Sequence, residues 1–215
     1  FKLIMRNMLF GMIWCALAFV LTNKSCIEIP VSICGLSLMP FIEEVMKGCI
    51  LARLTIRGKF RFMSQCLIYG AAIGSGFSLL ENLLYFYLNP SMVVGTGIVR
   101  GFDCAIMHMG CTALFVTFLL LLRHRFGVFL SLLISIVPSS IIHFLYNLVM
   151  ENSLISFTLA LVLVVLIFII LFVLLFAIGE RKIRKWMDCS INNDIIMLSA
   201  IRSGNFPTTE TGKYL

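Results

Sequence analysis

Residues 157–178 read FTLALVLVVLIFIILFVLLFAI and contain no charged side chain. A helix rises 1.5 Å per residue, so about 20 apolar residues cross the roughly 30 Å hydrocarbon core of a bilayer. Comparable stretches recur along the chain, and 60% of its 215 residues are hydrophobic whereas 13% are charged. Soluble domains carry roughly 25% charged residues. The sequence therefore predicts an all-α, polytopic membrane protein.

We expect a bundle of about six transmembrane helices, at residues 3–22, 29–54, 63–88, 92–122, 127–150 and 153–178. The first stretch contains Arg6 and Asn7 near its start and lacks a small-residue cleavage site, so we expect a retained helix. Residues 1–185 are predicted to form the transmembrane domain, and residues 186–215 a short polar cytoplasmic tail.

The net charge of +7 comes from Lys and Arg residues that gather in short segments between apolar runs. Such a distribution indicates how the chain is oriented in the membrane. This distribution excludes nucleic-acid binding as the meaning of the charge. Alternate connections carry the basic residues, which predicts an integral plasma-membrane protein with both termini cytoplasmic. The eight cysteines lack paired spacing, and most of them lie inside apolar stretches, where they are interpreted as small buried hydrophobes: Cys15, Cys34, Cys49, Cys66, Cys104 and Cys111.

Three ionisable residues interrupt the second apolar stretch, in the segment Pro40-Phe-Ile-Glu-Glu-Val-Met-Lys-Gly48. A charged side chain near the bilayer centre costs at least about 2.5–3.5 kcal/mol, so it is a functional hypothesis by default. Lys47 stands at i,i+4 from Glu43 and i,i+3 from Glu44, so it can serve either carboxylate. Two adjacent carboxylates cannot both ionise cheaply there, which suits acid/base chemistry. The alternative is a structural Glu–Lys pair.

Gly70, Gly74, Phe77 and Glu81 share one face of the third predicted helix, because spacings of four, three and four return to the same side. Small residues on this face permit close approach of a neighbouring helix. Glu81 is therefore expected to point into the bundle, with Asn82 beside it. A carboxylate satisfied by structural contacts is the alternative.

The fourth and fifth stretches carry the remaining polar candidates. His108 lies near the middle of the fourth, where a lone histidine is more often a core residue, and Arg100 with Asp103 reads as an ion pair at the membrane boundary. His143 and Asn147, at i,i+4 on the fifth, can present two donors to one oxygen atom. Hydrogen bonding between helices is the structural alternative for this pair.

Taken in order, these motifs resemble the four motifs of the PrsW family of glutamic-type intramembrane proteases: Glu43-Glu44-Val-Met-Lys47, Phe77-Ser-Leu-Leu-Glu81-Asn82, His108 and His143. The family is grouped with the CAAX-processing and Abi membrane proteases, and His143-Phe-Leu-Tyr-Asn147 resembles a motif of those relatives. The resemblance covers about residues 40–150. Lys47 and Glu81 depart from the CAAX-type pattern, which favours the PrsW branch.

The resemblance implies an intramembrane endopeptidase acting on a single-span or membrane-anchored protein, such as an anti-sigma factor-like regulator. The predicted catalytic residues are Glu43, Glu44, Glu81, His108, His143 and Asn147, supported by Lys47, Phe77 and Asn82. Either adjacent glutamate would act as general base on a water molecule, and His143 and Asn147 would donate to the oxyanion. By resemblance, His108 and Glu81 orient the water.

No cofactor is expected, although a zinc set of Glu81, His108 and His143 is a rival, with Glu43 or Glu44 as base. No His-Glu-x-x-His motif accompanies it. The absence of this motif counts against zinc, but a zinc-dependent or CAAX-type endopeptidase is kept as an alternative. A non-catalytic scaffold or transporter is another, although the first and last three stretches show no convincing symmetry. The motif positions place the site in the middle to outer half of the bilayer.

Overall fold

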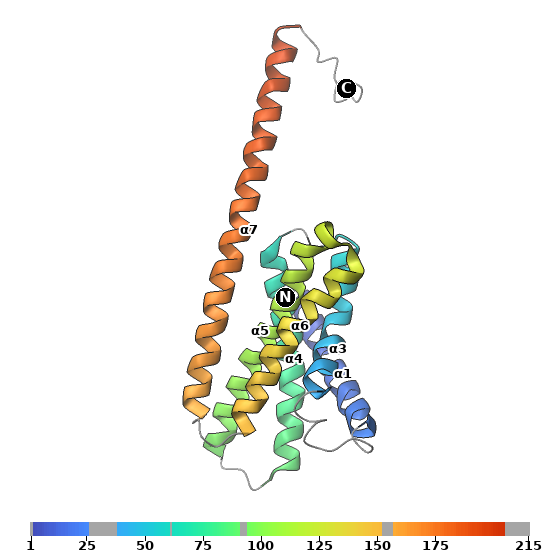
Figure 1. Ribbon diagram of the computed structural model, residues 1–215, viewed down its shortest axis with the longest axis vertical. Helices are drawn as coiled ribbons and strands as arrows, with labels where there is room; N and C mark the ends of the chain where they lie inside the picture. The colour runs from blue at the N-terminus through green and yellow to red at the C-terminus, as the bar shows by residue number, and fades with distance from the viewer. Residues whose placement is uncertain (1, 26–37, 61, 91–93, 152–156, 205–215) are drawn as a thin grey trace. The chain divides into compact units, whose positions relative to one another are not determined.

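The computed structural model describes residues 2–25, 38–60, 62–90, 94–151 and 157–204 (Figure 1). Within these ranges the chain forms no strand, and its α-helices are α1 (Lys2–Ser25), α3 (Met39–Ile56), α4 (Met63–Leu88), α5 (Val94–Phe126), α6 (Val128–Glu151) and α7 (Phe157–Arg202). The predicted all-α fold is confirmed.

Five of the described helices are long and apolar enough to cross a membrane, over Lys2–Leu21, Met63–Leu88, Arg100–Arg123, Val128–Met150 and Val162–Arg202. The chain is an integral membrane protein. Helix α3 does not meet that description, because its 18 residues include Glu43, Glu44, Lys47 and Arg53. The beginning of the predicted span 29–54 lies outside the described residues.

The chain divides into two compact units, Phe1–Phe172 and Val173–Leu215. The second unit holds the later part of α7, which is helical to Arg202 and exposes apolar side chains such as Trp186 and Ile195. Residues 186–202 of the predicted polar tail are thus helical. The boundary between residues 185 and 186 stays a prediction.

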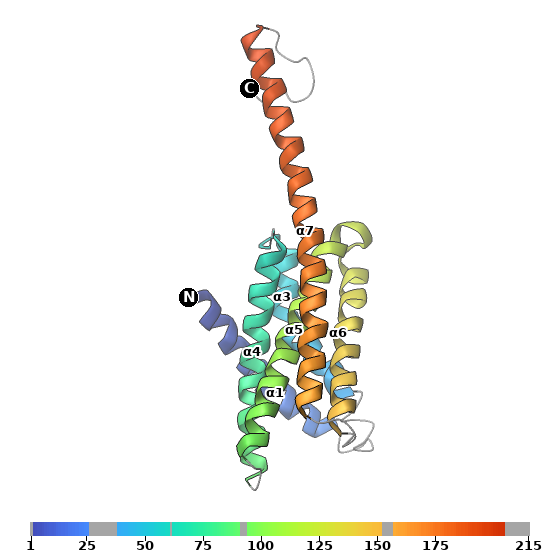
Figure 2. The same ribbon diagram turned by 90° about the vertical axis from the view of Figure 1, so that its left-hand side faces the viewer.

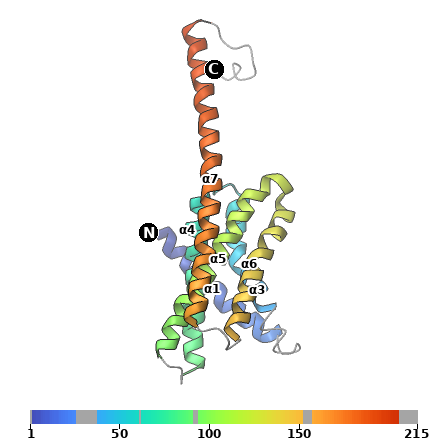
Figure 3. The same cartoon turned by 60° about the vertical axis from the view of Figure 1, so that its left-hand side comes forward.

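Helices α4 and α5 pack backbone to backbone in the first unit, and lie side by side in Figures 2 and 3. A Cβ atom added at Gly70 would meet the backbone of Ala113, and one at Gly74 would meet the backbone of His108 and Met109. The glycine face predicted on the third apolar stretch is therefore the α5-facing side of α4. This close approach brings His108 to the level of the polar residues of α4.

Helix α1 covers another side of α4 with the same kind of contact. A Cβ atom at Gly11 would collide with the backbone of Ile73 and Phe77, and one at Gly76 would collide with the backbone of Met8. Helix α4 is thus held between α1 and α5, which fixes the rotation of its polar residues.

Helices α3 and α6 pack against α5 through a buried apolar cluster that includes Leu51, Phe60, Phe115, Val116, Leu119 and Ile136. The turn between α5 and α6 depends on Gly127, whose φ of 74° lies in the left-handed region that glycine adopts without steric penalty. Cys15, Cys66, Cys104 and Cys111 are buried as predicted.

Cys49 is exposed, so the prediction that it is buried is wrong. Cys49 lies on a side of α3 that the neighbouring helices leave uncovered. Cys34, which carried the same prediction, lies outside the described residues.

The close contact between α4 and α5 predicts that Gly74→Ala destabilises the fold by about 1–3 kcal/mol, because the new methyl group must displace backbone. Gly101→Ala on α5 is the matched control, since a Cβ there meets nothing within 4 Å. Denaturant unfolding in detergent micelles, followed by circular dichroism, measures both. Equal midpoints for the two variants would contradict the packing described.

Candidate active site

Lys47 of α3 is fully buried and lies at the centre of the polar cluster. Its ammonium donates to Oε1 of Glu44, lies 2.8 Å from Nδ1 of His108, and sits 4.7 Å from the centroid of the Phe77 ring. An ammonium has protons to donate and no lone pair to accept with. Lys47 is therefore the donor in both polar contacts, and Nδ1 of His108 must accept.

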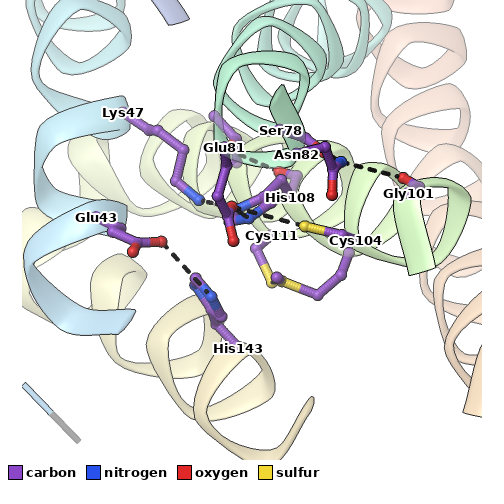
Figure 4. Close-up of polar contacts among 12 residues, drawn as sticks. Glu43, Lys47, Ser78, Glu81, Asn82, Gly101, Cys104, His108, Cys111 and His143 are labelled. Carbon is purple, nitrogen blue, oxygen red and sulfur yellow. Dashed lines mark hydrogen bonds and ion pairs between the residues drawn. The ribbon is translucent and has the colours of Figure 1, made fainter. Parts of the chain in front are cut away.

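That assignment fixes the other side of the His108 ring. With Nδ1 accepting, Nε2 carries the proton of the neutral imidazole and donates to Oε2 of Glu81 over 2.5 Å. The thiol of Cys104 lies 3.6 Å from the same oxygen (Figure 4). Lys47, His108 and Glu81 thus form one directed chain across α3, α5 and α4.

His143 of α6 contacts both adjacent glutamates of α3. Its Nδ1 lies 2.9 Å from Oε1 of Glu44, and its Nε2 lies 3.7 Å from Oε2 of Glu43. Because the ionised Glu44 carboxylate only accepts, Nδ1 carries the proton and Nε2 keeps its lone pair. Figure 4 shows Glu43 and His143 turned towards each other. The rings of His108 and His143 meet edge to face at 4.8 Å.

The two adjacent glutamates occupy different environments. The Glu44 side chain is fully buried, and its Oε1 accepts from both Lys47 and His143. The Glu43 side chain is 12% exposed, and its Oε2 is buried without a hydrogen-bond partner. Oε2 of Glu44 is likewise buried without a hydrogen-bond partner. The two residues differ because Lys47 and His143 hold the Glu44 carboxylate through Oε1, whereas Glu43 faces Nε2 of His143 without a direct hydrogen bond.

A cavity of about 150 Å³ adjoins these groups, between α1, α3 and α4. Glu43 and Glu81 both line it, together with apolar residues such as Cys15, Phe77 and Leu84. A cavity of this size has room for water, whose share of liquid volume is about 30 Å³. The two carboxylates therefore face a space in which a water molecule and a small part of a substrate can meet.

Asn82 lies beside the cluster and ties α4 to α5. Its amide nitrogen donates to Oγ of Ser78 at 3.0 Å and to the carbonyl of Gly101 at 3.4 Å. Arg100 donates to its amide oxygen at 3.1 Å. Asn82 is a positioning residue here, as is Phe77, whose ring lies 5.0 Å from that of His108.

The predicted ion pair between Arg100 and Asp103 is wrong. The guanidinium of Arg100 instead lies 3.5 Å from the centroid of the Tyr85 ring while it binds Asn82. Both carboxylate oxygens of Asp103 are buried without a hydrogen-bond partner. Spacing along α5 allowed the pair, but the neighbouring helix α4 offered Arg100 closer partners. Tyr85, one turn after Glu81, was the signal that sequence reasoning missed.

Five of the six predicted catalytic residues meet in this cluster, and Asn147 stands apart. It is half-buried on α6, one turn beyond His143, and its side chain makes no hydrogen bond among the described residues.

Two groups of side chains place ligand atoms within 4.8 Å of one another: Glu43 with His108 and His143, and Glu81 with Cys104 and His108. The predicted zinc set differs from the first group, because Glu43 takes the place of Glu81. Imidazoles and a carboxylate are ligands that Zn²⁺ accepts, and the free oxygen of Glu43 fits such a role. His108, however, has both nitrogens engaged by Lys47 and Glu81.

The central position of Lys47 predicts that Lys47→Met destabilises the protein by about 3–5 kcal/mol, because Glu44 would keep a buried charge without its cation. Adding Glu44→Leu should recover part of that loss. Unfolding in detergent micelles measures each variant. Arg184→Met, which breaks the exposed pair with Glu180, is the control and should cause no measurable change. A loss no larger than that of the control would show that Lys47 does not hold the cluster.

The family model described as PrsW family intramembrane metalloprotease matches residues 2–175, most of the chain and the whole of this cluster. Comparison with curated proteins and with solved structures gives no match. The description names a metal, so a cofactor-free enzyme is not confirmed, and the zinc alternative is consistent with it. The chain belongs to the PrsW family and is an intramembrane protease.

Proposed function

We propose that the enzyme hydrolyses a peptide bond of a single-span or membrane-anchored protein, such as an anti-sigma factor-like regulator, with Glu43 as general base. The observation that carries this proposal is the unpartnered Oε2 of Glu43, which lies 3.7 Å from Nε2 of His143. That separation is too long for a direct hydrogen bond, yet one water molecule can reach both atoms. A general base must lie within hydrogen-bond reach of the proton it takes.

In the first step, the Glu43 carboxylate takes a proton from the water, and the water oxygen forms a bond to the carbonyl carbon of the substrate. The carbonyl π electrons move onto its oxygen and give a tetrahedral oxyanion. In the second step, the oxyanion re-forms the carbonyl, the carbon–nitrogen bond breaks, and the Glu43 carboxyl returns its proton to the leaving nitrogen. The products are a carboxylic acid and an amine.

Glu44 and Lys47 serve this reaction by positioning. Lys47 and His143 both donate to Oε1 of Glu44, which holds the His143 ring with its free Nε2 towards Glu43. His108 and Glu81 would bound the other side of the water, as the resemblance implied. Asn147 is the proposed oxyanion donor, because it stands one turn beyond His143 on α6 and its side-chain amide carries two donor hydrogens. His143 can donate from Nε2 once it is doubly protonated.

A metal-dependent reaction is the second candidate, favoured by the ligand group of Glu43, His108 and His143. Those residues would hold a divalent ion such as Zn²⁺, which would supply Lewis-acid polarisation of water and of the substrate carbonyl. Glu44 would then hold His143 by its Nδ1, as outer carboxylates do for metal-bound histidines. The occupied nitrogens of His108 favour the metal-free chemistry.

We further propose that the enzyme lies in the plasma membrane with both termini cytoplasmic, which places the site in the outer half of the bilayer. Glu81 is seven residues from the end of α4, and His143 is eight residues from the end of α6. At 1.5 Å per residue these offsets are about 10–12 Å. Arg53 and Arg57 lie at the opposite end of α3, and basic residues favour the cytoplasmic side.

Glu43→Gln is predicted to lower the turnover of a single-span substrate in liposomes by about 10²–10⁴-fold, because an amide cannot take the proton. Glu44→Gln keeps an acceptor oxygen for Lys47 and should lose roughly 10–100-fold. Glu180→Gln, an exposed glutamate, is the control and should keep full activity. A larger loss in Glu44→Gln than in Glu43→Gln would reverse the assigned roles.

Whether the enzyme binds a divalent metal ion can be measured directly on the same purified proteins. Elemental mass spectrometry of purified wild type, Glu43→Gln and His143→Ala should find no stoichiometric divalent ion, and dialysis against a chelator should leave turnover unchanged. One ion per wild-type chain that both variants lose would establish the metal site instead.

The depth of the site predicts that the substrate is cut near the extracytoplasmic end of its transmembrane helix, which releases its external domain. Mass spectrometry of the membrane-retained fragment locates the new terminus. A cut in the cytoplasmic third of the substrate helix would be incompatible with this topology or with this site.

A further inference from the structure

A groove of about 520 Å³ opens between α3 and α6, away from the polar cluster. Its lining is apolar over most of its length and includes Val45, Cys49, Ala52, Phe115, Leu133 and Ile136. Gly48 keeps its floor close to α5, since a Cβ there would lie 2.7 Å from the Phe115 ring. Phe41, Val45, Cys49 and Leu133 are exposed, so the groove faces the surroundings of the bundle.

Two cations mark one end of this groove. Arg53 and Arg57 line it, stand one helical turn apart and are both exposed. Neither forms an ion pair with any carboxylate of the described residues. The nearest acidic residue along α3 is Glu44, nine positions before Arg53, and it is already paired with Lys47. The groove therefore combines an apolar channel with an unneutralised positive end.

We propose that this groove is a binding site for an anionic diacyl phospholipid, with one acyl chain in the groove between α3 and α6 and its phosphate on Arg53 and Arg57. Basic pockets between transmembrane helices bind acidic lipid headgroups, and a guanidinium pairs well with phosphate oxygens. The arrangement of the site matches the shape of such a lipid, which carries its charge at one end and hydrocarbon along the rest.

The volume of the groove favours a lipid over a substrate helix. A helix about 10 Å across occupies roughly 400 Å³ per 5.4 Å turn, and about 20 residues are needed to span the hydrocarbon core. The 520 Å³ groove therefore holds little more than one helical turn. A single acyl chain is far narrower than a helix and fits a groove of this volume, while the second chain of the lipid would lie on the outer surface of α3 and α6.

A lipid bound in the groove would contact α3, the helix that carries Glu43 and Glu44. A lipid seated there contacts Val45, one residue beyond Glu44, and covers the contact between Gly48 and Phe115. A ligand that binds the folded protein stabilises it by mass action. Anionic lipid should thus stabilise the packing of α3 against α5, whether or not the protease mechanism proposed above is correct.

The test compares phosphatidylglycerol with phosphatidylcholine of the same acyl chains, added to delipidated protein in neutral detergent. Native mass spectrometry measures the bound lipid, and thermal unfolding measures the stabilisation. Phosphatidylglycerol should bind near one equivalent and raise the melting temperature by several degrees, whereas phosphatidylcholine should do neither. Arg53→Gln with Arg57→Gln should weaken phosphatidylglycerol binding roughly 30-fold.

Lys59→Gln with Arg125→Gln is the matched control, because it removes two exposed charges that do not line the groove. It should leave phosphatidylglycerol binding unchanged. An equal loss in the two double variants would overturn the proposal in favour of attraction to the basic surface as a whole.

Cys49 reports on the groove itself without any substitution. Its exposed thiol should react with a maleimide more slowly when phosphatidylglycerol is present, as read from the Cys49 peptide by mass spectrometry, while the exposed Cys189 reacts at an unchanged rate. Protection of Cys49 by a single-span substrate but not by phosphatidylglycerol would assign the groove to the substrate and overturn the lipid proposal.

Discussion

The polar cluster depends on the fact that a buried lysine ammonium can only donate. Lys47 contacts Glu44 and His108 at once, so both of them must accept. From this one constraint follow the proton on Nε2 of His108, its donation to Glu81, and the proton on Nδ1 of His143 that faces the already occupied Glu44 oxygen. Once these partners are assigned, Nε2 of His143 keeps a lone pair and lies 3.7 Å from Oε2 of Glu43, which has no hydrogen-bond partner.

The directed contacts exist because the helices approach more closely than ordinary side chains would allow. Gly74 lets the backbone of α4 rest on α5 at His108, and Gly11 with Gly76 does the same between α1 and α4. Helix α4 is held on two sides, and Glu81 is therefore fixed at the level of His108. Van der Waals packing of small residues drives helix association in lipid, so the glycine faces that build the fold also set the geometry of the site.

Sequence reasoning predicted much of this because periodicity reports which side of one helix a residue occupies. The glycine face of α4 and the mid-helix ionisable residues follow from spacing and hydropathy alone. Spacing does not report partners on other helices: it paired Arg100 with Asp103, whereas Arg100 binds Asn82 and Tyr85. Spacing also did not distinguish Glu43 from Glu44, because the packing of α3 against α6 decides that Nδ1 of His143 contacts Glu44 while Nε2 faces Glu43. For the same reason it grouped Glu81 with the two histidines as zinc ligands, whereas Glu43 is the carboxylate that lies close to both.

The charges of the cluster explain why the same side chains suit two chemistries. Among the described residues, Lys47 is the permanent cation within the cluster of Glu43, Glu44 and Glu81, Arg100 lies beside it on Asn82, and both histidines are neutral when their hydrogen bonds are assigned as above. An excess of negative charge away from water is costly, so the cluster favours a compensating positive species. In the glutamate mechanism, this excess of negative charge favours the transfer of a proton from water to the Glu43 carboxylate. In the metal mechanism, Glu43 and His143 would hold a divalent ion that balances the charge. Activation of the water would depend on Glu43 in either case.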